Sequence, residues 1–372
     1  MASGDPSLVI AAGGTGGHIY PGLALARAVS RASPRARVSF VGTRRGLEQR
    51  VVPGAGFELD LLDMVPFAGW GRVTLPVALV RASVQARRVL RRRRAGVAVG
   101  MGGYTTAPLV TGARLAGVPS LVHESGAVPG RANLVAARVC TGVATALPSA
   151  AGAFGRSTTV RNVGMPLAPE LEAFDRERLR PSARRAWQVS DATTLVLVIG
   201  GSQGAVTLNR LAVGLARRWR GRTDIRILLK AGSAHLDRVA EELSASGAAH
   251  VVEATAYIDR MDHAYAAADV AVCRAGAGTV AELAVVGLPS VLVPYPHAPH
   301  DHQARNASDL VAAGGAVMVR DAEATPEIVG PLLEGSLTDG GTLARMRAAL
   351  TSLARPRAAE ELAAWALELA AG

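Results

Sequence analysis

Short apolar runs alternate with helical segments along most of this chain, and this alternation limits the folds that it can adopt. Runs that are apolar throughout are typical of strands buried on both faces of a parallel sheet, and crossover helices connect such strands. We therefore predict an α/β fold with helices on both faces of parallel sheets. The expected strands are residues 8–12, 36–41, 57–62, 97–101, 120–122, 142–146, 195–199, 225–229, 251–254, 270–273, 290–293 and 317–319.

A proline-rich segment interrupts the alternation near the middle of the chain, at residues 164–170. Proline interrupts both helices and sheets, so we interpret this segment as a hinge. Two doubly wound domains then fit the pattern better than one large sheet, with domains at residues 1–163 and 171–355. In the last residues, 356–372, the apolar residues recur at helical spacing and the charges are mixed. We expect this segment to form a helix that packs across both domains.

The composition narrows the class of protein. Apolar residues make up 49% of the 372 residues and aromatic residues only 4%, so Ala, Val and Leu must fill the cores. Because we find neither a membrane-spanning run nor a secretion signal, we expect a cytoplasmic protein. Cys140 and Cys273 lie far apart and indicate neither a disulfide framework nor a zinc site. The net charge of +11 favours anionic partners, which include nucleotides, nucleic acid and anionic membranes.

The segment at residues 268–294 predicts an anion site. A buried strand leads through Arg274 and Gly276 into a helix that we expect to begin at Thr279, whose hydroxyl would cap the first turn. Free backbone N–H groups and the helix dipole at such a start attract anions. Glu282 lies one turn further on and is expected to face a ligand. A packing role for the small residues is the simpler alternative, but Arg274 and Glu282 favour a phosphate-and-ribose clamp.

A second glycine-rich turn, residues 199–205, also joins a strand to a helix, and Ser202 with the following amides suits a phosphate oxygen. Two such turns at one sheet edge fit a diphosphate better than a single phosphate. Downstream, His302 and Gln303 lie in a loop rich in histidine. Prolines break its helical register, so we favour a sugar-binding loop over a metal site.

The first strand runs directly into a glycine-rich turn that ends at His18. A dinucleotide site would require an acidic residue after the second strand, and its absence disfavours an NAD-dependent enzyme. His18 is either a helix cap, or a general base or substrate contact. The turn around Gly103 and the pair His123–Glu124 follow later strands and should lie at the same sheet edge. Glu124 is equally consistent with a buried structural carboxylate.

The segment at residues 73–94 carries apolar residues at helical spacing, with arginines gathered at its end. Packing on the sheet by Val73, Val77, Val80 and Val84 is the simplest interpretation. The alternative is a membrane-surface patch, formed together with Val65, Phe67, Trp70 and the arginines at 87–94. Nucleic-acid binding is disfavoured because aromatic residues do not interleave the basic ones.

Taken together, these motifs resemble those of the MurG family, glycosyltransferases that add N-acetylglucosamine to lipid I in peptidoglycan synthesis. The matching segments are GGTGGHIYPGLALA from Gly13, VGTRRGLEQRVVP from Val41, GMGGYTTAP from Gly100, HESGAVPGRAN from His123, GGSQGA from Gly200, CRAGAGTVAEL from Cys273 and DHQARNA from Asp301. The resemblance implies a GT-B fold of two Rossmann-like domains with a cleft between them. It also implies inversion at the anomeric carbon with no essential metal and no cofactor.

The resemblance also implies partners and a location. The donor is UDP-N-acetylglucosamine, bound mainly by the C-terminal domain, and the acceptor is a lipid-linked sugar at the N-terminal domain. The protein would lie peripherally on the cytoplasmic face of an anionic membrane, with a cell-wall synthesis complex as a further partner and no nucleic acid.

Residue roles follow from the same resemblance. Arg274 would lie beside the uracil and Glu282 at the ribose, with His18 and Glu124 as the catalytic and acceptor-side groups. The other donor-binding candidates are Thr15, Gly16, Gly17, Ser202, Gln203, Gly276, Ala277, Thr279, His302 and Gln303, and the acceptor-binding candidates are Gly103, Tyr104, Gly126 and Asn133.

The chain departs from the family pattern at several positions. Ser125-Gly126 replaces a usual Gln-Asn pair, and Ala168 replaces an arginine of the hinge. Gly278 replaces a common leucine, and residues 229–232 replace a His-Gln-Thr-Gly-like run. These departures keep two alternatives open, namely a transferase for another prenyl-linked or natural-product acceptor, and a non-catalytic nucleotide-sugar-binding scaffold.

Overall fold

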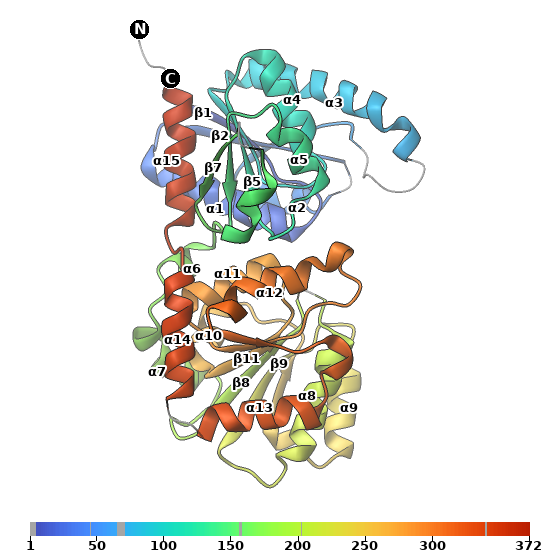
Figure 1. Cartoon of the computed structure of the whole chain (residues 1–372), viewed down its shortest axis with the longest axis vertical. Helices are drawn as coiled ribbons and strands as arrows, with labels where there is room; N and C mark the ends of the chain where they lie inside the picture. Colours follow the sequence, from blue (N-terminus) through green and yellow to red (C-terminus); the bar gives the residue numbers. More distant parts are fainter. Residues whose placement is uncertain (1–4, 45, 65–70, 156–157, 202, 339–340) are drawn as a thin grey trace. The chain divides into compact units, whose positions relative to one another are not determined.

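The computed structural model describes residues 5–44, 46–64, 71–155, 158–201, 203–338 and 341–372 (Figure 1). The chain forms two compact units. Unit 1 comprises Met1–Pro169 and Arg355–Gly372, and unit 2 comprises Glu170–Ala354. The chain passes from the first unit to the second within the predicted hinge, at residues 169 and 170, and returns at residues 354 and 355.

Unit 1 is built on a seven-stranded sheet in the order β3-β2-β1-β4-β5-β6-β7, and every described pair of strands is parallel. Its strands are β1 (Ser7–Ala11), β2 (Arg37–Gly42), β3 (Glu58–Leu61), β4 (Val97–Gly100), β5 (Ser120–Glu124), β6 (Gly142–Thr145) and β7 (Thr159–Asn162). Its helices are α1 (Gly16–Ala32), α2 (Glu48–Gly54), α3 (Gly71–Arg93), α4 (Thr106–Ala116), α5 (Arg131–Ala137) and α15 (Ala358–Ala371). The strand order reverses between β1 and β4, and ligands of doubly wound sheets bind beside that reversal.

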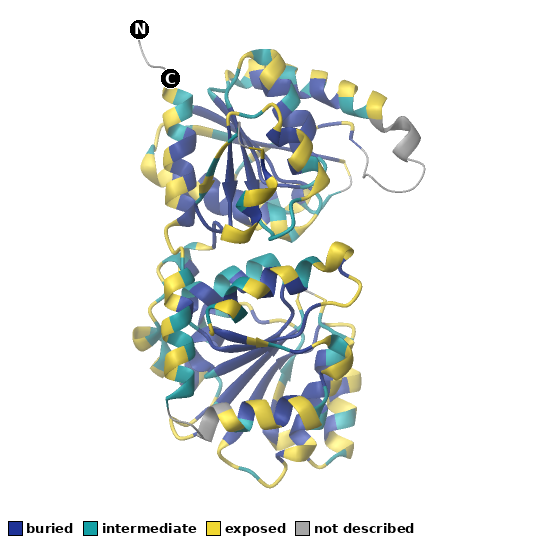
Figure 2. Ribbon diagram, viewed as in Figure 1, coloured by how far each residue is buried: buried dark blue, intermediate teal, exposed yellow. Residues whose placement is uncertain are grey.

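The last helix of the chain completes the core of unit 1. α15 packs against α1, β1 and β4, and Leu362, Ala363 and Trp365 join the same apolar cluster as Leu8 and Ile10 of β1. Strands β1, β4, β5 and β6 are buried along their whole length, as Figure 2 shows, because helices cover both faces of the sheet, whereas the edge strands β3 and β7 are partly exposed. The predicted packing of α15 across both domains stays a prediction.

Unit 2 repeats the architecture with a six-stranded parallel sheet in the order β10-β9-β8-β11-β12-β13. Its strands are β8 (Thr194–Ile199), β9 (Ile225–Lys230), β10 (Val252–Thr255), β11 (Val270–Cys273), β12 (Ser290–Leu292) and β13 (Ala316–Met318). Its helices are α6 (Pro169–Glu172), which begins at the unit boundary, α7 (Arg176–Ala186), α8 (Val206–Arg218), α9 (Leu236–Ala245), α10 (Met261–Ala267), α11 (Ala277–Val286), α12 (His302–Ala312), α13 (Pro326–Thr338) and α14 (Thr342–Leu353).

An arginine cluster closes the end of unit 2 that lies opposite the carboxyl ends of its strands. Asp269, just before β11, forms ion pairs with Arg176, Arg180 and Arg184 of α7 at 3.4, 2.6 and 3.2 Å. Arg347 of α14 donates to the backbone oxygen of Asp269 at 3.3 Å. The α7 arginines also donate to the last carbonyls of α10, where cations are favoured by the helix dipole.

The predicted α/β fold with two Rossmann-like domains is confirmed, and most strand ends lie within a residue or two of the predicted ones. Strand β7 was missed. The expected start of α11 at Thr279 was wrong, because the helix begins at Ala277 with Gly276 in the extended N-cap conformation.

The predicted packing face of the segment at residues 73–94 was also wrong. Val77 and Val80 of α3 are 74% and 66% exposed, whereas Ala82, Ala86 and Leu90 are buried. Ala86 and Leu90 pack in the same cluster as Leu109 of α4, and Val77 and Val80 remain on the outer surface.

Candidate active site

His18 lies on the first turn of α1, against the glycine turn that follows β4. Its backbone N–H donates to the Thr15 carbonyl at 3.1 Å, and its Nδ1 lies 3.4 Å from Thr15 Oγ1. Gly102 and Gly103 have φ values of +102° and +77°, and a Cβ on Gly102 would lie 2.6 Å from the imidazole Cδ2. Only glycine fits this turn, because it tolerates positive φ values and has no side chain to collide with the His18 ring.

The environment of the His18 imidazole favours its neutral form. Burial lowers its pKa below the ordinary value of 6.5, and a hydrogen bond with the Gly13 backbone opposes this only in part. A neutral, half-buried imidazole at the carboxyl edge of a parallel sheet can accept a proton from a hydroxyl group. The geometry is therefore compatible with the predicted general base.

The strand-end loops of unit 1 are held together by Glu48, a residue that sequence reasoning missed. Its fully buried carboxylate accepts hydrogen bonds from Gly14 N at 3.2 Å, Thr43 N at 2.8 Å and Thr43 Oγ1 at 3.1 Å. The Tyr104 hydroxyl joins the network at 3.1 Å from Thr43 Oγ1. Tyr104, a predicted acceptor-binding residue, thus has a partner inside the protein, and Glu48 positions the loop that carries His18.

Glu124 is engaged within the protein at both carboxylate oxygens. It accepts from Gly126 N at 3.0 Å, Gly130 N at 3.1 Å and Asn133 Nδ2 at 2.7 Å. Burial raises its pKa, and these hydrogen bonds oppose the shift. The carboxylate therefore shapes the loop between β5 and α5, as in the structural alternative. Its catalytic role stays a prediction, as do the acceptor-binding roles of Gly126 and Asn133.

In unit 2, Arg274 follows β11 and is buried rather than open to solvent. Its Nη1 donates to the carbonyls of Val293 and Pro294 at 3.1 and 3.2 Å and pairs with Asp321. The guanidinium carbon lies 5.6 Å from the centre of the Tyr295 ring. These contacts fix the guanidinium against the segment that follows β12, and its predicted place beside the uracil stays a prediction.

Glu282 of α11 is half-buried and accepts a hydrogen bond from the Tyr265 hydroxyl at 2.6 Å. Burial raises the pKa of Glu282, while Tyr265 and the charge of Lys230 oppose the shift. The carboxylate is thus oriented by α10 and α11 together. Its predicted contact with ribose hydroxyls stays a prediction.

Two of the remaining donor-side candidates, His302 and Gln303, lie on the first turn of α12 and not in a loop, so the predicted loop was wrong at these two residues. Gln303 Oε1 accepts from Tyr295 N at 2.9 Å, and His302 Nδ1 lies 2.9 Å from the Pro299 carbonyl oxygen. Ser202 lies outside the described residues, as do Val65, Phe67 and Trp70 of the predicted membrane patch.

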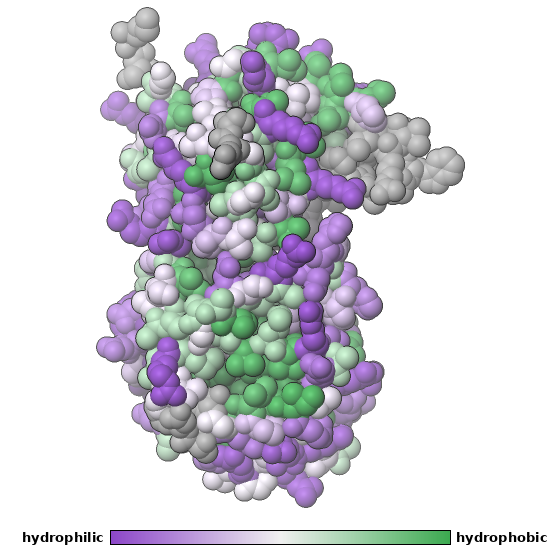
Figure 3. Space-filling model, in the orientation of Figure 1, coloured by the Kyte–Doolittle hydropathy of each residue, from purple (hydrophilic) through white to green (hydrophobic). Residues whose placement is uncertain are grey.

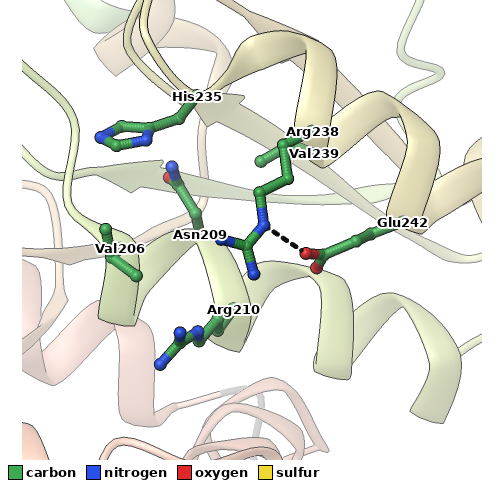
Figure 4. Close-up of a pocket in the computed structure, with 7 residues that line it drawn as sticks. All are labelled: Val206, Asn209, Arg210, His235, Arg238, Val239 and Glu242. Atoms are coloured by element: carbon green, nitrogen blue, oxygen red, sulfur yellow. Dashed lines mark hydrogen bonds and ion pairs between the residues drawn. The ribbon is translucent and has the colours of Figure 1, made fainter.

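A small pocket lies between α8 and α9 (Figure 4). Asn209 and Arg210 line it from one side, and His235, Arg238 and Glu242 line it from the other. Its volume of about 30 Å³ suits a water molecule or two, so it is too small for a nucleotide sugar. Within the described ranges, no cluster of His, Cys, Asp or Glu has the arrangement of a metal site.

Comparisons with known proteins agree with this geometry. The chain matches the Glycosyltransferase family 28 N-terminal domain over residues 8–145 and the corresponding C-terminal domain over residues 195–362. It is 41% identical to a UDP-N-acetylglucosamine–N-acetylmuramyl-(pentapeptide) pyrophosphoryl-undecaprenol N-acetylglucosamine transferase of Mycolicibacterium vanbaalenii, covering 98% of this chain and 90% of the relative. The protein of that name from Saccharopolyspora erythraea is also 41% identical, with 100% and 96% coverage.

A solved structure shows a similarity to the same family of proteins. The crystal structure of Acinetobacter baumannii MurG superposes with a TM-score of 0.79 at 28% identity, covering 98% of this chain and 99% of that one. Staphylococcus aureus MnaA with UDP has a TM-score of 0.69 at 12% identity, a likeness that shows the fold alone. By its two family 28 domains and its full-length similarity, this chain belongs to the MurG family of glycosyltransferases.

Proposed function

We propose that this chain transfers N-acetylglucosamine from UDP-N-acetylglucosamine to the MurNAc 4-hydroxyl of lipid I and so forms lipid II. The observation that carries the proposal is 41% identity, over nearly the whole chain, to enzymes named for this transfer. The two Rossmann-like units and the strand-end loops described above supply the matching architecture.

In the proposed reaction, His18 accepts the proton of the acceptor hydroxyl as its oxygen attacks the anomeric carbon. The bond from that carbon to the diphosphate breaks with inversion, and UDP leaves with the bonding electrons. Backbone N–H groups at the start of α11 and in the loop after β8 stabilise the charge that gathers on the diphosphate. The proposed reaction requires no bound metal ion.

The alternatives of another acceptor and of a non-catalytic scaffold are not favoured by the comparisons. UDP release, measured with and without lipid I, separates them. We expect release only when lipid I is present. UDP release only with a different prenyl-linked acceptor would favour a transferase for that acceptor. Tight donor binding with no turnover on any acceptor would favour the non-catalytic scaffold.

Replacing Glu282 with alanine should weaken binding of UDP-N-acetylglucosamine by about 1–3 kcal/mol, because ribose hydroxyls lose a charged partner. Calorimetry measures the change. Tyr265→Phe is the matched control, because it removes the hydrogen bond to Glu282 but keeps the carboxylate. Unchanged affinity in Glu282→Ala would remove Glu282 from the ribose site.

We also propose that α3 holds the protein peripherally on the cytoplasmic face of an anionic membrane. Val77 and Val80 present exposed apolar surface on this helix. Figure 3 shows hydrophobic and hydrophilic residues mixed over the described surface of unit 1. Arg88 and Arg91 are exposed and make no ion pair with a described residue, whereas Arg92 pairs with Asp60. None of the described helices combines the length and apolar character that crossing a membrane requires.

Val77→Ser combined with Val80→Ser should reduce binding to anionic liposomes about tenfold or more, because two exposed valines no longer enter the apolar layer. Sedimentation at several salt concentrations measures this, and the parent protein should bind less as salt rises. Val206→Ser, at an exposed valine of unit 2, is the control and should change nothing. Binding that ignores both the double substitution and salt would contradict the patch.

A further inference from the structure

Lys230 is the only lysine of the chain, although Lys and Arg together number 41. It is the last residue of β9 and pairs in register with Ile199, the last residue of β8. The glycine-rich loop at residues 200–204 begins directly after Ile199. Lys230 therefore lies at the carboxyl edge of the sheet, beside the loop predicted to receive phosphate.

Close backbone packing fixes Lys230 relative to that loop. A Cβ on Gly204 would lie 1.9 Å from the Ala231 carbonyl oxygen, and one on Gly232 would lie 2.3 Å from the Gln203 carbonyl oxygen. The turn that follows Lys230 thus lies directly against the loop after β8. A side chain larger than hydrogen at either glycine would separate the two segments.

The Lys230 ammonium lacks an anionic partner. The residue is only 9% exposed, and its Nζ lies 5.2 Å from the centre of the Tyr257 ring. The ammonium makes no hydrogen bond or ion pair with any residue that the structure describes. Glu282 favours the charged form from a distance, yet burial lowers the Lys230 pKa overall. A buried ammonium that has an aromatic ring beside it but no anion is costly, so a bound anion would stabilise this arrangement.

We propose that Lys230 is a donor-binding residue whose ammonium contacts the diphosphate of the nucleotide sugar. This assignment rests on the proposed function, because it takes the donor to be a nucleoside diphosphate sugar. A lysine ammonium offers three N–H donors to phosphate oxygens, and its charge opposes the negative charge that the diphosphate gains as it leaves. Lys230 then supports both donor affinity and turnover.

Reductive methylation with ¹³C-formaldehyde tests the contact on the full chain, because Lys230 and the chain's terminal α-amino group are its only primary amines. Saturating UDP should protect Lys230 from methylation while the α-amino group, the internal reference, reacts as before. Uridine, which has the same base and ribose but no phosphate, should give no protection.

Substitution gives an independent measurement. Lys230→Met should weaken UDP binding about 10- to 100-fold, the effect of losing a hydrogen bond to a charged group. Uridine binding should be unchanged in this variant, and Lys230→Arg should retain most of the UDP affinity.

Three results would overturn the assignment. UDP affinity could be unchanged in Lys230→Met, Lys230 could be methylated at the same rate when UDP is bound, or uridine and UDP could lose affinity equally, as a purely structural role predicts. A parent protein that binds no UDP would overturn the proposed function together with this assignment. A parent that binds UDP normally while Lys230→Met does too would overturn the assignment alone.

Discussion

Replacing His18 with alanine is expected to lower the turnover number about 10²–10⁴-fold, the usual contribution of a general base. Donor affinity should change little, because His18 lies in unit 1 and the predicted uracil and ribose contacts lie in unit 2. Single-turnover kinetics and donor calorimetry measure the two quantities. His250→Ala, at an exposed histidine of unit 2 whose Nε2 lies 3.1 Å from the Arg220 carbonyl oxygen, is the control.

The pH profile gives a second measure of the same residue. His18 must be neutral to accept a proton, and burial lowers its pKa below 6.5. The rate should therefore fall as pH decreases through a value below 6.5, and this acid limb should be absent in His18→Ala. A variant with parental turnover, when chemistry limits the rate, would reduce His18 to a residue that shapes the loop.

Replacing Asp269 with asparagine should lower the free energy of unfolding of unit 2 by about 3–5 kcal/mol, because it leaves the buried Arg184 and two partly buried arginines without their carboxylate. Arg176, Arg180 and Arg184 all pair with this one side chain. Burial and the neighbouring Arg347 and Arg180 lower the pKa of Arg176 to about 9, which shows how crowded the positive charges are. Urea unfolding, followed by two independent probes, measures the loss.

Asp191→Asn is the matched control for Asp269→Asn. Asp191 pairs with the same Arg184 at 3.6 Å, but its side chain is 99% exposed. Exposed ion pairs contribute about 0–1 kcal/mol, so this variant should unfold nearly as the parent does. Similar stability losses in the two variants would contradict the central place of Asp269 in the cluster.

The fold was predictable because buried parallel strands are apolar throughout, so β1, β8 and β11 stand out as uninterrupted runs. The same criterion explains why strand β7 was missed. It is an edge strand with alternating exposed residues, Thr159 and Arg161 among them, and lacks the continuous apolar character of its neighbours.

The candidate site was predictable where glycine turns mark strand ends, as at His18 and Arg274. Glu48 and Lys230 were harder to find because burial is not visible from residue type, and charged residues are ordinarily exposed. The valines of α3 illustrate the opposite case, since their helical spacing predicts a packing face while alanines in the same helix supply it. In both cases tertiary packing decided which side chains were covered.

Identification of the product tests the central claim most directly. The chain is incubated with UDP-N-acetylglucosamine and lipid I, and the lipid product is analysed by mass spectrometry and by NMR of the anomeric proton. The account predicts lipid I extended by one N-acetylglucosamine, β-linked to the MurNAc 4-hydroxyl, with UDP released in equal amount. Unmodified lipid I, under conditions where the donor is shown to bind, would contradict it.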